Sequence, residues 1–268
     1  MQPRLLSHRA LGFGYRENTF KAFKEALLSD VHEIELDFRL TKDDVYVCNH
    51  DPELRISSKK KVLIKAKTFA ELNEDRKIIA SFDEILHYFA KKNHDKILNI
   101  DLKDYGNEEH IIKLIKRLKI KKNVIIVSWI PKVLEKIRQL DSTVKLSLSY
   151  APARKHLFKA FSLFQMQFKM KKNRRLFFVN KSNMKQFNEK YNKGFHHIHI
   201  FSHLPKRILC LKLDSINIPW YLVSQELVHE AHELGIKVRV FNVDNKKSLE
   251  RIKKKNVDTI FTNEVYEL

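Results

Sequence analysis

Residues 32–38 have the sequence His-Glu-Ile-Glu-Leu-Asp-Phe, in which acidic and apolar side chains alternate. This alternation predicts a β-strand, because successive side chains of a strand point to opposite faces of the sheet. Glu35 and Asp37 are two positions apart, so both carboxylates are expected on one face and the apolar residues on the other. Two carboxylates that point into a protein interior are costly to bury without a cation. The stretch therefore indicates a strand that contributes to a functional site.

Similar strand patterns recur along the whole chain and alternate with segments of helical periodicity. We expect strands at Arg4–Ser7, His32–Phe38, Val45–Asn49, Ile97–Asp101, Val124–Trp129, Val144–Ser149, Ser215–Pro219, Val238–Asn242 and Thr259–Thr262. We expect helices at Thr19–Leu28, Glu108–Leu118, Lys132–Leu140 and Ser224–Leu234. This alternation predicts an α/β fold with a parallel sheet and right-handed crossovers.

A closed (β/α)8 TIM barrel is favoured over an open doubly wound sheet. The length of 268 residues suits one such barrel, and no glycine-rich phosphate-binding fingerprint follows the first strand. Nine candidate strands exceed the eight of a barrel, so at least one is expected to be an extra hairpin strand or not a strand.

Composition favours one folded domain over residues 1–268. The chain has 43% hydrophobic and 31% charged residues, which excludes a disordered tail protein. No apolar run approaches the roughly 18 residues of a membrane-spanning helix, and the first residues lack the features of a signal peptide. Cys48 and Cys210 lie far apart in apolar runs, which favours reduced thiols over a disulfide or a zinc site. We therefore expect a cytoplasmic protein.

The formal net charge of +20 is unevenly distributed. Residues 151–212 contain fifteen Lys and Arg and one acidic residue, Glu189, and so carry a net charge of +14. Large apolar residues from Phe158 onward are mixed with the basic ones and would form one face of a helix. We interpret this segment as an elaboration of the domain. A core-packing helix followed by a basic loop is favoured, peripheral contact with an anionic membrane is an alternative, and nucleic-acid binding is the least favoured.

Polar residues cluster where the first strands end, and in a barrel the carboxyl ends of the strands form the active site. They are His8 and Arg9, Glu35 and Asp37, His50 and Asp51, and Asp101 and Lys103. A hard divalent cation bound by Glu35, Asp37 and Asp101 would balance the buried carboxylates. Ligands that are all oxygen atoms favour Mg²⁺ or Ca²⁺ over zinc.

The remaining residues of this set suit cleavage of a phosphodiester. His8 and His50 suit acid–base catalysis, because an ordinary histidine pKa near 6.5 allows one to accept a proton while the other donates. Arg9 and Lys103 suit binding of phosphate oxygens. The joint occurrence of these residues at successive strand ends favours a catalytic site over isolated structural residues.

Several motifs resemble, in the same order, those that open the glycerophosphodiester phosphodiesterases. They are His8-Arg-Ala, Arg16-Glu-Asn-Thr, Glu35-Leu-Asp, Thr41-Lys-Asp-Asp and His50-Asp. The family's pattern is His-Arg-Gly, Pro-Glu-Asn-Thr, Glu-x-Asp, Thr-x-Asp-Gly and His-Asp. Further similarity includes Asn99-Ile-Asp-Leu-Lys103 and Val257-Asp-Thr-Ile-Phe-Thr-Asn263, and it covers nearly the whole chain except about 151–212. The resemblance implies a barrel of the phosphatidylinositol-phospholipase-C-like type with a basic insertion. It also implies metal-dependent hydrolysis of glycerophosphodiesters to glycerol 3-phosphate and an alcohol.

The resemblance also assigns roles to residues of this chain. It implies His8 and His50 as the acid–base pair, Glu35, Asp37 and Asp101 as ligands of Mg²⁺ or Ca²⁺, and Arg9, Lys103, Glu17 and Phe241 as residues that contact or border the substrate. The chain departs from the family at Asp101, which replaces a Glu, and at Phe241, which replaces a Trp. It also departs at Ala10 and Asp44, which replace Gly, and at Arg16, which replaces Pro.

Three other functions stay open. They are a lysophospholipase-D-like enzyme that docks on membrane lipid through 151–212, a non-catalytic barrel that binds phospholipid, and, from charge alone, a nucleic-acid-binding protein. The histidines at 196, 197, 199 and 203 suggest a transition-metal site, but no carboxylate or cysteine has matching spacing. We interpret them as an incidental cluster.

Overall fold

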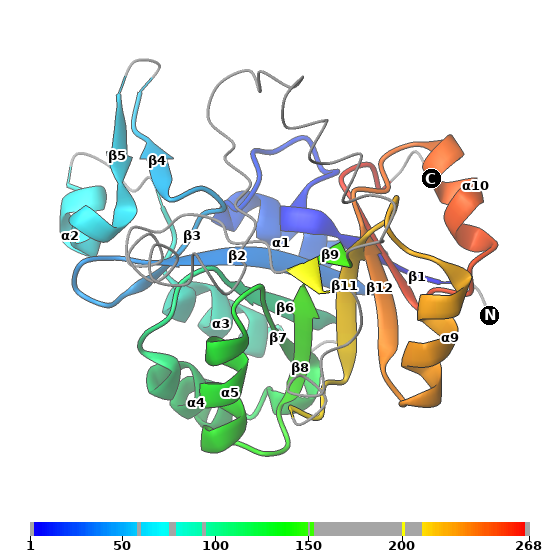
Figure 1. Ribbon diagram of the computed structural model, residues 1–268. Coiled ribbons are helices and arrows are strands. Elements are labelled where there is room, and N and C mark those ends of the chain that lie inside the picture. The colour runs from blue at the N-terminus through cyan, green and yellow to red at the C-terminus, as the bar shows by residue number, and fades with distance from the viewer. Residues whose placement is uncertain are drawn as a thin grey trace, which may run out of the picture.

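The computed structural model shows a closed barrel, and it describes residues 3–57, 60–74, 79–92, 95–149, 151–152, 200–201 and 211–265. Eight parallel strands form the barrel: β1 (Arg4–Ser7), β2 (Glu33–Leu40), β6 (Ile97–Leu102), β7 (Val124–Ser128), β8 (Lys145–Ser149), β11 (Ser215–Pro219), β12 (Lys237–Phe241) and β13 (Thr259–Thr262). Strand β1 pairs with both β2 and β13, which closes the sheet. The predicted (β/α)8 barrel is confirmed (Figure 1).

The ninth predicted strand is an additional hairpin strand. Strand β3 (Tyr46–Cys48) pairs antiparallel with β2, with Phe38 opposite Cys48. The connecting turn has Asp44 at φ +58°, a left-handed conformation that Asp tolerates better than most residues, so Asp can take the place of the family's Gly. His50 follows this third strand, as predicted, and the strand is the returning arm of the hairpin, which carries His50 back to the site.

Helices cover the outside of the barrel and begin at residues that suit helix starts. They are α1 (Phe20–Leu28), α3 (Phe82–Lys91), α4 (Glu108–Arg117), α5 (Pro131–Leu140), α9 (Gln225–Glu233) and α10 (Lys246–Lys253), and short 3₁₀ turns occur at His8–Ala10 and Lys121–Asn123. The Thr19 hydroxyl accepts a hydrogen bond from the Ala22 amide at 3.2 Å and caps α1 as expected. All four predicted helices are present.

A small substructure follows the hairpin and was not predicted. It consists of β4 (Glu53–Arg55), β5 (Lys61–Leu63), the 3₁₀ turn Ile64–Ala66 and α2 (Phe69–Leu72), seen in cyan at the left of Figure 1. Its apolar side chains form a separate buried cluster of Val47, Leu54, Ile64, Leu72 and Ile79. Because Val47 belongs to β3, this cluster fixes the substructure beside the strand that leads to His50.

The barrel interior contains a buried charged layer next to the candidate site. Arg239 pairs with Glu33 and donates to the Asn99 side-chain oxygen at 2.7 Å. Glu33 precedes Glu35 on β2, and Asn99 precedes Asp101 on β6, so this layer lies nearer the amino ends of the strands. The side chains of Arg239, Glu33 and Asn99 therefore fill the barrel interior below the polar residues at the carboxyl ends of the strands.

The basic segment predicted at about 151–212 lies mostly outside the described residues, together with the expected helix from Phe158 and the histidine cluster at 196–203. Of its backbone, β9 (Ala151–Pro152) pairs in parallel with β10 (Ile200–Phe201). None of the helices that the structure describes is long and apolar enough to cross a membrane.

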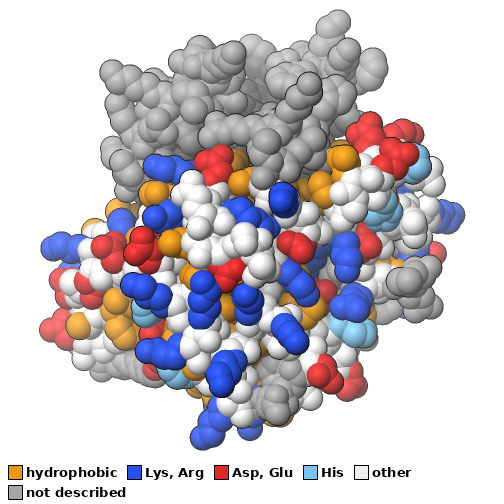
Figure 2. Space-filling model, turned by 90° about the horizontal axis from the view of Figure 1, so that it is seen from below, with side chains coloured by type: hydrophobic (Ala, Val, Ile, Leu, Met, Phe, Trp, Pro, Cys, Tyr) orange, Lys and Arg blue, Asp and Glu red, His pale blue; other side chains and the backbone are white. Residues whose placement is uncertain are grey.

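Positive charge is also present outside the segment 151–212. Lys and Arg side chains gather on the face of the molecule seen in Figure 2. Exposed basic residues on α4, in the turn after it and at the start of α5 include Lys113, Lys116, Arg117, Lys119, Lys122 and Lys132.

Candidate active site

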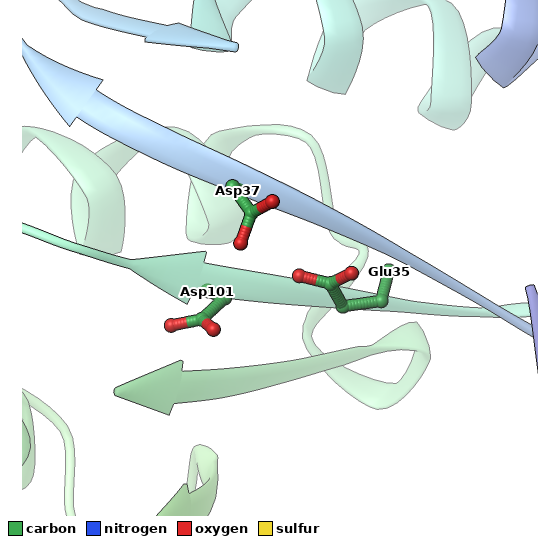
Figure 3. A group of neighbouring side chains, drawn as sticks. All are labelled: Glu35, Asp37 and Asp101. Carbon is green, nitrogen blue, oxygen red and sulfur yellow. The ribbon is translucent and has the colours of Figure 1, made fainter. Parts of the chain in front are cut away.

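Three buried carboxylates converge at the carboxyl ends of two neighbouring strands. Glu35 and Asp37 project from β2 and Asp101 from β6, and the three side chains lie close together (Figure 3). The strand register places Asp37 directly beside Asp101. One oxygen from each residue lies within 4.8 Å of the others, and all three side chains are buried. The structure thus brings together the predicted metal ligands.

The cluster has two buried oxygens that lack a hydrogen-bond partner. They are Glu35 Oε1 and Asp101 Oδ1. Burial, and then the charges of neighbouring carboxylates, raises the pKa of Glu35 well above its usual range. Burial also raises the pKa of Asp101, although the charge of Lys103 opposes this. Unpartnered oxygens in a site of oxygen donors fit a hard divalent cation, and the shorter side chain of Asp101 still reaches the cluster.

Two cations border the carboxylates. Lys103 Nζ lies 2.7 Å from Asp37 Oδ1 and also pairs with Asp101. Arg9 Nε lies 3.5 Å from Asp37 Oδ2, and Arg9 Nη1 donates to Glu17 Oε2 at 3.0 Å. Burial opposes ionisation of Asp37, but the nearby charges, above all that of Lys103, hold its pKa well below the usual range. Glu17 thus holds the Arg9 guanidinium beside Asp37.

Asn18 is a further residue of the site, and it was not predicted. Its Nδ2 donates to Asp37 Oδ2 at 2.8 Å, and its Oδ1 accepts from the Asp37 amide at 2.9 Å. Asn18 has φ +55°, a conformation that Asn adopts more readily than most residues. The signal was present in the sequence, since Asn18 belongs to the Glu-Asn-Thr motif.

His8 lies directly after β1, beside the carboxylates, and its side chain is partly buried. Its Nδ1 lies 2.9 Å from Asn263 Oδ1, and its Nε2 lies 3.9 Å from Glu35 Oε2. Burial, helped by the charge of Arg9, lowers the pKa of His8 to about 3. These effects favour the neutral imidazole. The next amide, that of Arg9, donates to Glu35 Oε2 at 2.9 Å and ties the loop to the acidic cluster.

His50 faces the same cluster from the hairpin side. Its Nδ1 lies 2.8 Å from Asp51 Oδ1, so Asp51 does turn toward it. The charges of Asp37 and Asp51 favour the imidazolium, but burial has the larger effect and lowers the pKa of His50. Asp51 therefore raises the pKa of His50, but burial lowers it by more. Arg39 Nε donates to the His50 carbonyl oxygen at 3.0 Å and holds the backbone.

Comparison with known proteins places this site in a family. The model of the glycerophosphoryl diester phosphodiesterase family matches residues 8–267. The chain belongs to this family. The family match begins at His8 and includes all of the carboxylates, histidines and cations described above.

Two curated relatives show the extent of the similarity. A glycerophosphodiester phosphodiesterase of Bacillus altitudinis is 30% identical over 142 residues, which are 47% of this chain and 58% of the relative. One of Caldanaerobacter subterraneus is 29% identical over 166 residues, which are 56% of this chain and 68% of the relative. The alignment to the Bacillus protein thus spans little more than half of that protein's length.

Two solved structures show the same fold. A putative glycerophosphodiester phosphodiesterase from Galdieria sulphuraria aligns with a TM-score of 0.71 at 16% identity, over 98% of this chain and 94% of the other. An Oleispira antarctica phosphodiesterase, solved in complex with the product sn-glycerol-3-phosphate, aligns with a TM-score of 0.64 at 16% identity, over 98% of this chain and 93% of the other.

The departures from the family motifs have structural counterparts. Ala10 is buried and has φ +54°, so the family's glycine corresponds to a left-handed position. Arg16 is exposed in the same loop. Phe241, which replaces the family's Trp, ends β12 opposite β6 in the strand order, and its ring lies 5.9 Å from that of Trp129 in an edge-to-face arrangement. Phe241 therefore ends a strand across the barrel from the strand that carries Asp101, and its ring meets that of Trp129, which follows β7.

Proposed function

We propose that the protein hydrolyses glycerophosphodiesters to glycerol 3-phosphate and an alcohol with the help of a bound Mg²⁺ or Ca²⁺. The observation that carries the proposal is the group of three buried carboxylates, two of which have unpartnered oxygens, beside two histidines and two cations at the barrel mouth. Membership of the family supports the same reaction. The substrate is then a small molecule that enters the mouth of the barrel.

Glu35, Asp37 and Asp101 would hold the divalent cation. Such a cation, when bound, supplies positive charge that neutralises phosphate oxygens and the charge that develops on them. Asn18 holds Asp37 through two hydrogen bonds and so keeps one carboxylate oriented toward the other two. These contacts keep the ligand set in place before substrate binds.

Arg9 and Lys103 bind the phosphate of the substrate in this proposal. Both are already held beside Asp37, at 3.5 and 2.7 Å. Glu17 lies 3.0 Å from the Arg9 guanidinium and positions it. Positive groups that are fixed in advance stabilise a developing negative charge without reorganising during the reaction.

The two histidines move the protons. Nδ1 of His8 pairs with the side-chain amide oxygen of Asn263, and Nδ1 of His50 pairs with the carboxylate of Asp51. A carboxylate stabilises an imidazolium more than an amide does, so we assign His8 as the base and His50 as the acid. His8 accepts a proton from the nucleophile, which is water or the glycerol 2-hydroxyl. His50 donates a proton to the oxygen of the leaving alcohol when the phosphorus–oxygen bond breaks.

Phosphorus NMR of the products tests the proposal. Glycerophosphocholine and glycerophosphoethanolamine are incubated with the protein and Mg²⁺ or Ca²⁺, with lysophospholipid vesicles in a parallel sample. The proposal predicts glycerol 3-phosphate from the soluble diesters, and no product with His50→Ala. Turnover of the vesicles alone would identify the lysophospholipase-D-like alternative, and phosphate binding without turnover would identify a binding protein.

A further inference from the structure

Asn263 is the hydrogen-bond partner of His8 on the side away from the carboxylates. Ser7 of β1 pairs with Thr262 of β13, so the residues that follow these strands lie next to each other at the carboxyl ends. Asn263 Oδ1 lies 2.9 Å from His8 Nδ1. The two residues are separated by 255 positions in the chain and meet only because the barrel closes.

Asp244 determines which way the Asn263 amide faces. Asn263 Nδ2 donates to Asp244 Oδ2 at 3.0 Å, and the Asn263 backbone amide donates to Asp244 Oδ1 at 2.8 Å. A carboxylate only accepts hydrogen bonds, so it selects the amide nitrogen, and the amide oxygen is left to face His8. The orientation therefore follows from the network of partners.

The backbone after β12 places Asp244 where it can accept the two hydrogen bonds from Asn263. Asn242 has φ +64° and turns the chain back toward β13. The Val243 amide donates to the Phe261 carbonyl oxygen at 3.3 Å. The loop after β12 is thereby joined to β13, and Asp244 lies beside Asn263.

The network fixes the position of the hydrogen on His8. An amide oxygen accepts and cannot donate, so the hydrogen between Asn263 and His8 belongs to His8 Nδ1. In the neutral ring, Nε2 then carries the lone pair, and Nε2 is the nitrogen that faces Glu35 at 3.9 Å. A free imidazole populates both tautomers, whereas this site accepts one.

We propose that Asp244 and Asn263 are positioning residues that hold His8 in the tautomer protonated at Nδ1, so that Nε2 is the atom that accepts a proton at the site. The consequence for catalysis rests on the proposed hydrolysis, but the tautomer itself does not. Neither residue needs to touch the substrate, because both act through the imidazole of His8.

Exchanging the two partners provides a sharp test. Asn263→Asp places two carboxylates side by side, and Asp244→Asn removes one of the two acceptors that orient the amide. The double variant Asp244→Asn/Asn263→Asp restores a complete network, in which Asn at 244 donates to Asp at 263 and Asp at 263 accepts from His8 Nδ1. A merely structural role would not predict recovery of the His8 tautomer by this exchange.

Nitrogen-15 NMR of the histidine rings reads the tautomer directly. The chain has 13 histidines, and the His8 signals are identified by their absence in His8→Gln. We expect the one-bond proton coupling on Nδ1 of His8 in the wild type and in the double variant, and a mixture of tautomers in Asn263→Ala. A wild-type His8 protonated at Nε2 overturns the proposal whether or not the protein is active.

Kinetics of glycerophosphocholine hydrolysis complete the test. We expect Asn263→Ala to lower kcat by about 10- to 100-fold, the usual cost of losing an orienting partner, with KM little changed, and the double variant to recover most of kcat. Asp258→Asn is a matched control, because Asp258 bonds His232 at 2.8 Å and the Val238 amide at 2.8 Å at the opposite end of the same strands. Wild-type kcat in Asn263→Ala would overturn the proposal. An inactive wild type would overturn the proposed function, and the NMR result would still decide the tautomer.

Discussion

Replacement of Glu35 by Gln is expected to stabilise the metal-free protein and to weaken its stabilisation by a divalent cation. Oxygens of Glu35, Asp37 and Asp101 lie within 4.8 Å of one another. Two unit charges at that distance repel by about 3.5 kcal/mol at the effective dielectric constant of roughly 20 that suits protein sites. The Lys103 ammonium pairs with Asp37 and Asp101 and offsets part of this repulsion. We therefore expect a net gain in the free energy of unfolding of about 1–2 kcal/mol.

Thermal unfolding measures this change. In EDTA, Glu35→Gln should unfold about 2–8 °C above the wild type, given about 2–4 °C per kcal/mol for a chain of this size. Added Mg²⁺ or Ca²⁺ should raise the wild-type Tm, because a ligand that binds only the folded state stabilises it, and should raise the variant's Tm less. Glu53→Gln, at an exposed carboxylate, is the control and should change neither value appreciably. A variant that is less stable than the wild type in EDTA would refute the reasoning.

The same comparison has a defined pH dependence. Burial, then the charges of Asp37 and Asp101, raises the pKa of Glu35 well above its usual range. A carboxyl group with a raised pKa in the folded state contributes stability below its unfolded pKa, and this contribution is lost as pH rises through the folded pKa. In EDTA, the stability advantage of Glu35→Gln over the wild type should therefore grow as pH rises above about 4.3, the usual Glu pKa. If the stability difference between Glu35→Gln and the wild type stays constant with pH, the raised pKa of Glu35 would be contradicted.

Two further changes test the framework around the site. Gly12 has φ +99°, and a Cβ there would lie 2.9 Å from Val265 Cγ2, whereas Gly14 at φ +76° has open space. Gly12→Ala should therefore destabilise the protein by about 1–3 kcal/mol more than Gly14→Ala, as measured by urea unfolding, and equal losses would contradict the contact. Arg239→Met should cost about 3–5 kcal/mol, because it leaves the Glu33 carboxylate buried without its cation. Adding Glu33→Gln should recover part of that loss, and its failure to do so would exclude the unpaired charge as the cause.

The barrel and most of the site were predictable because they depend on local patterns. The strand around Glu35 has alternating acidic and apolar residues, and the strand around Asp101 contains an apolar run. Both strands can therefore be recognised from the sequence alone. The rule that polar residues at the carboxyl ends of barrel strands meet then brings distant parts of the chain together. His8, Glu35 and Asp101 could therefore be grouped, although His8 follows β1 and the two carboxylates lie on β2 and β6.

The features that were missed depend on contacts or on weak local signals. Strands β4 and β5 have three residues each, too few for a clear alternation. Helix α10 begins with two lysines and buries only three of its residues, so its apolar stripe is narrow. The hydrogen bond between Asn263 and His8 joins the residues that follow the first and the last strand of the barrel, and no spacing in the sequence indicates it. The net pKa of His50 depends on burial, which the neighbouring Asp51 does not reveal.

Metal-dependent release of glycerol 3-phosphate tests the central claim most directly. The rate from glycerophosphocholine is measured in EDTA and after addition of Mg²⁺ or Ca²⁺, for the wild type and for Asp37→Asn. We predict turnover by the wild type only with the added cation, and at least a 100-fold lower kcat/KM for the variant, on the order of the loss of one major electrostatic contribution. Equal rates in EDTA and with cation, or an unimpaired Asp37→Asn, would contradict the assignment of these carboxylates as the metal-binding centre of a phosphodiesterase.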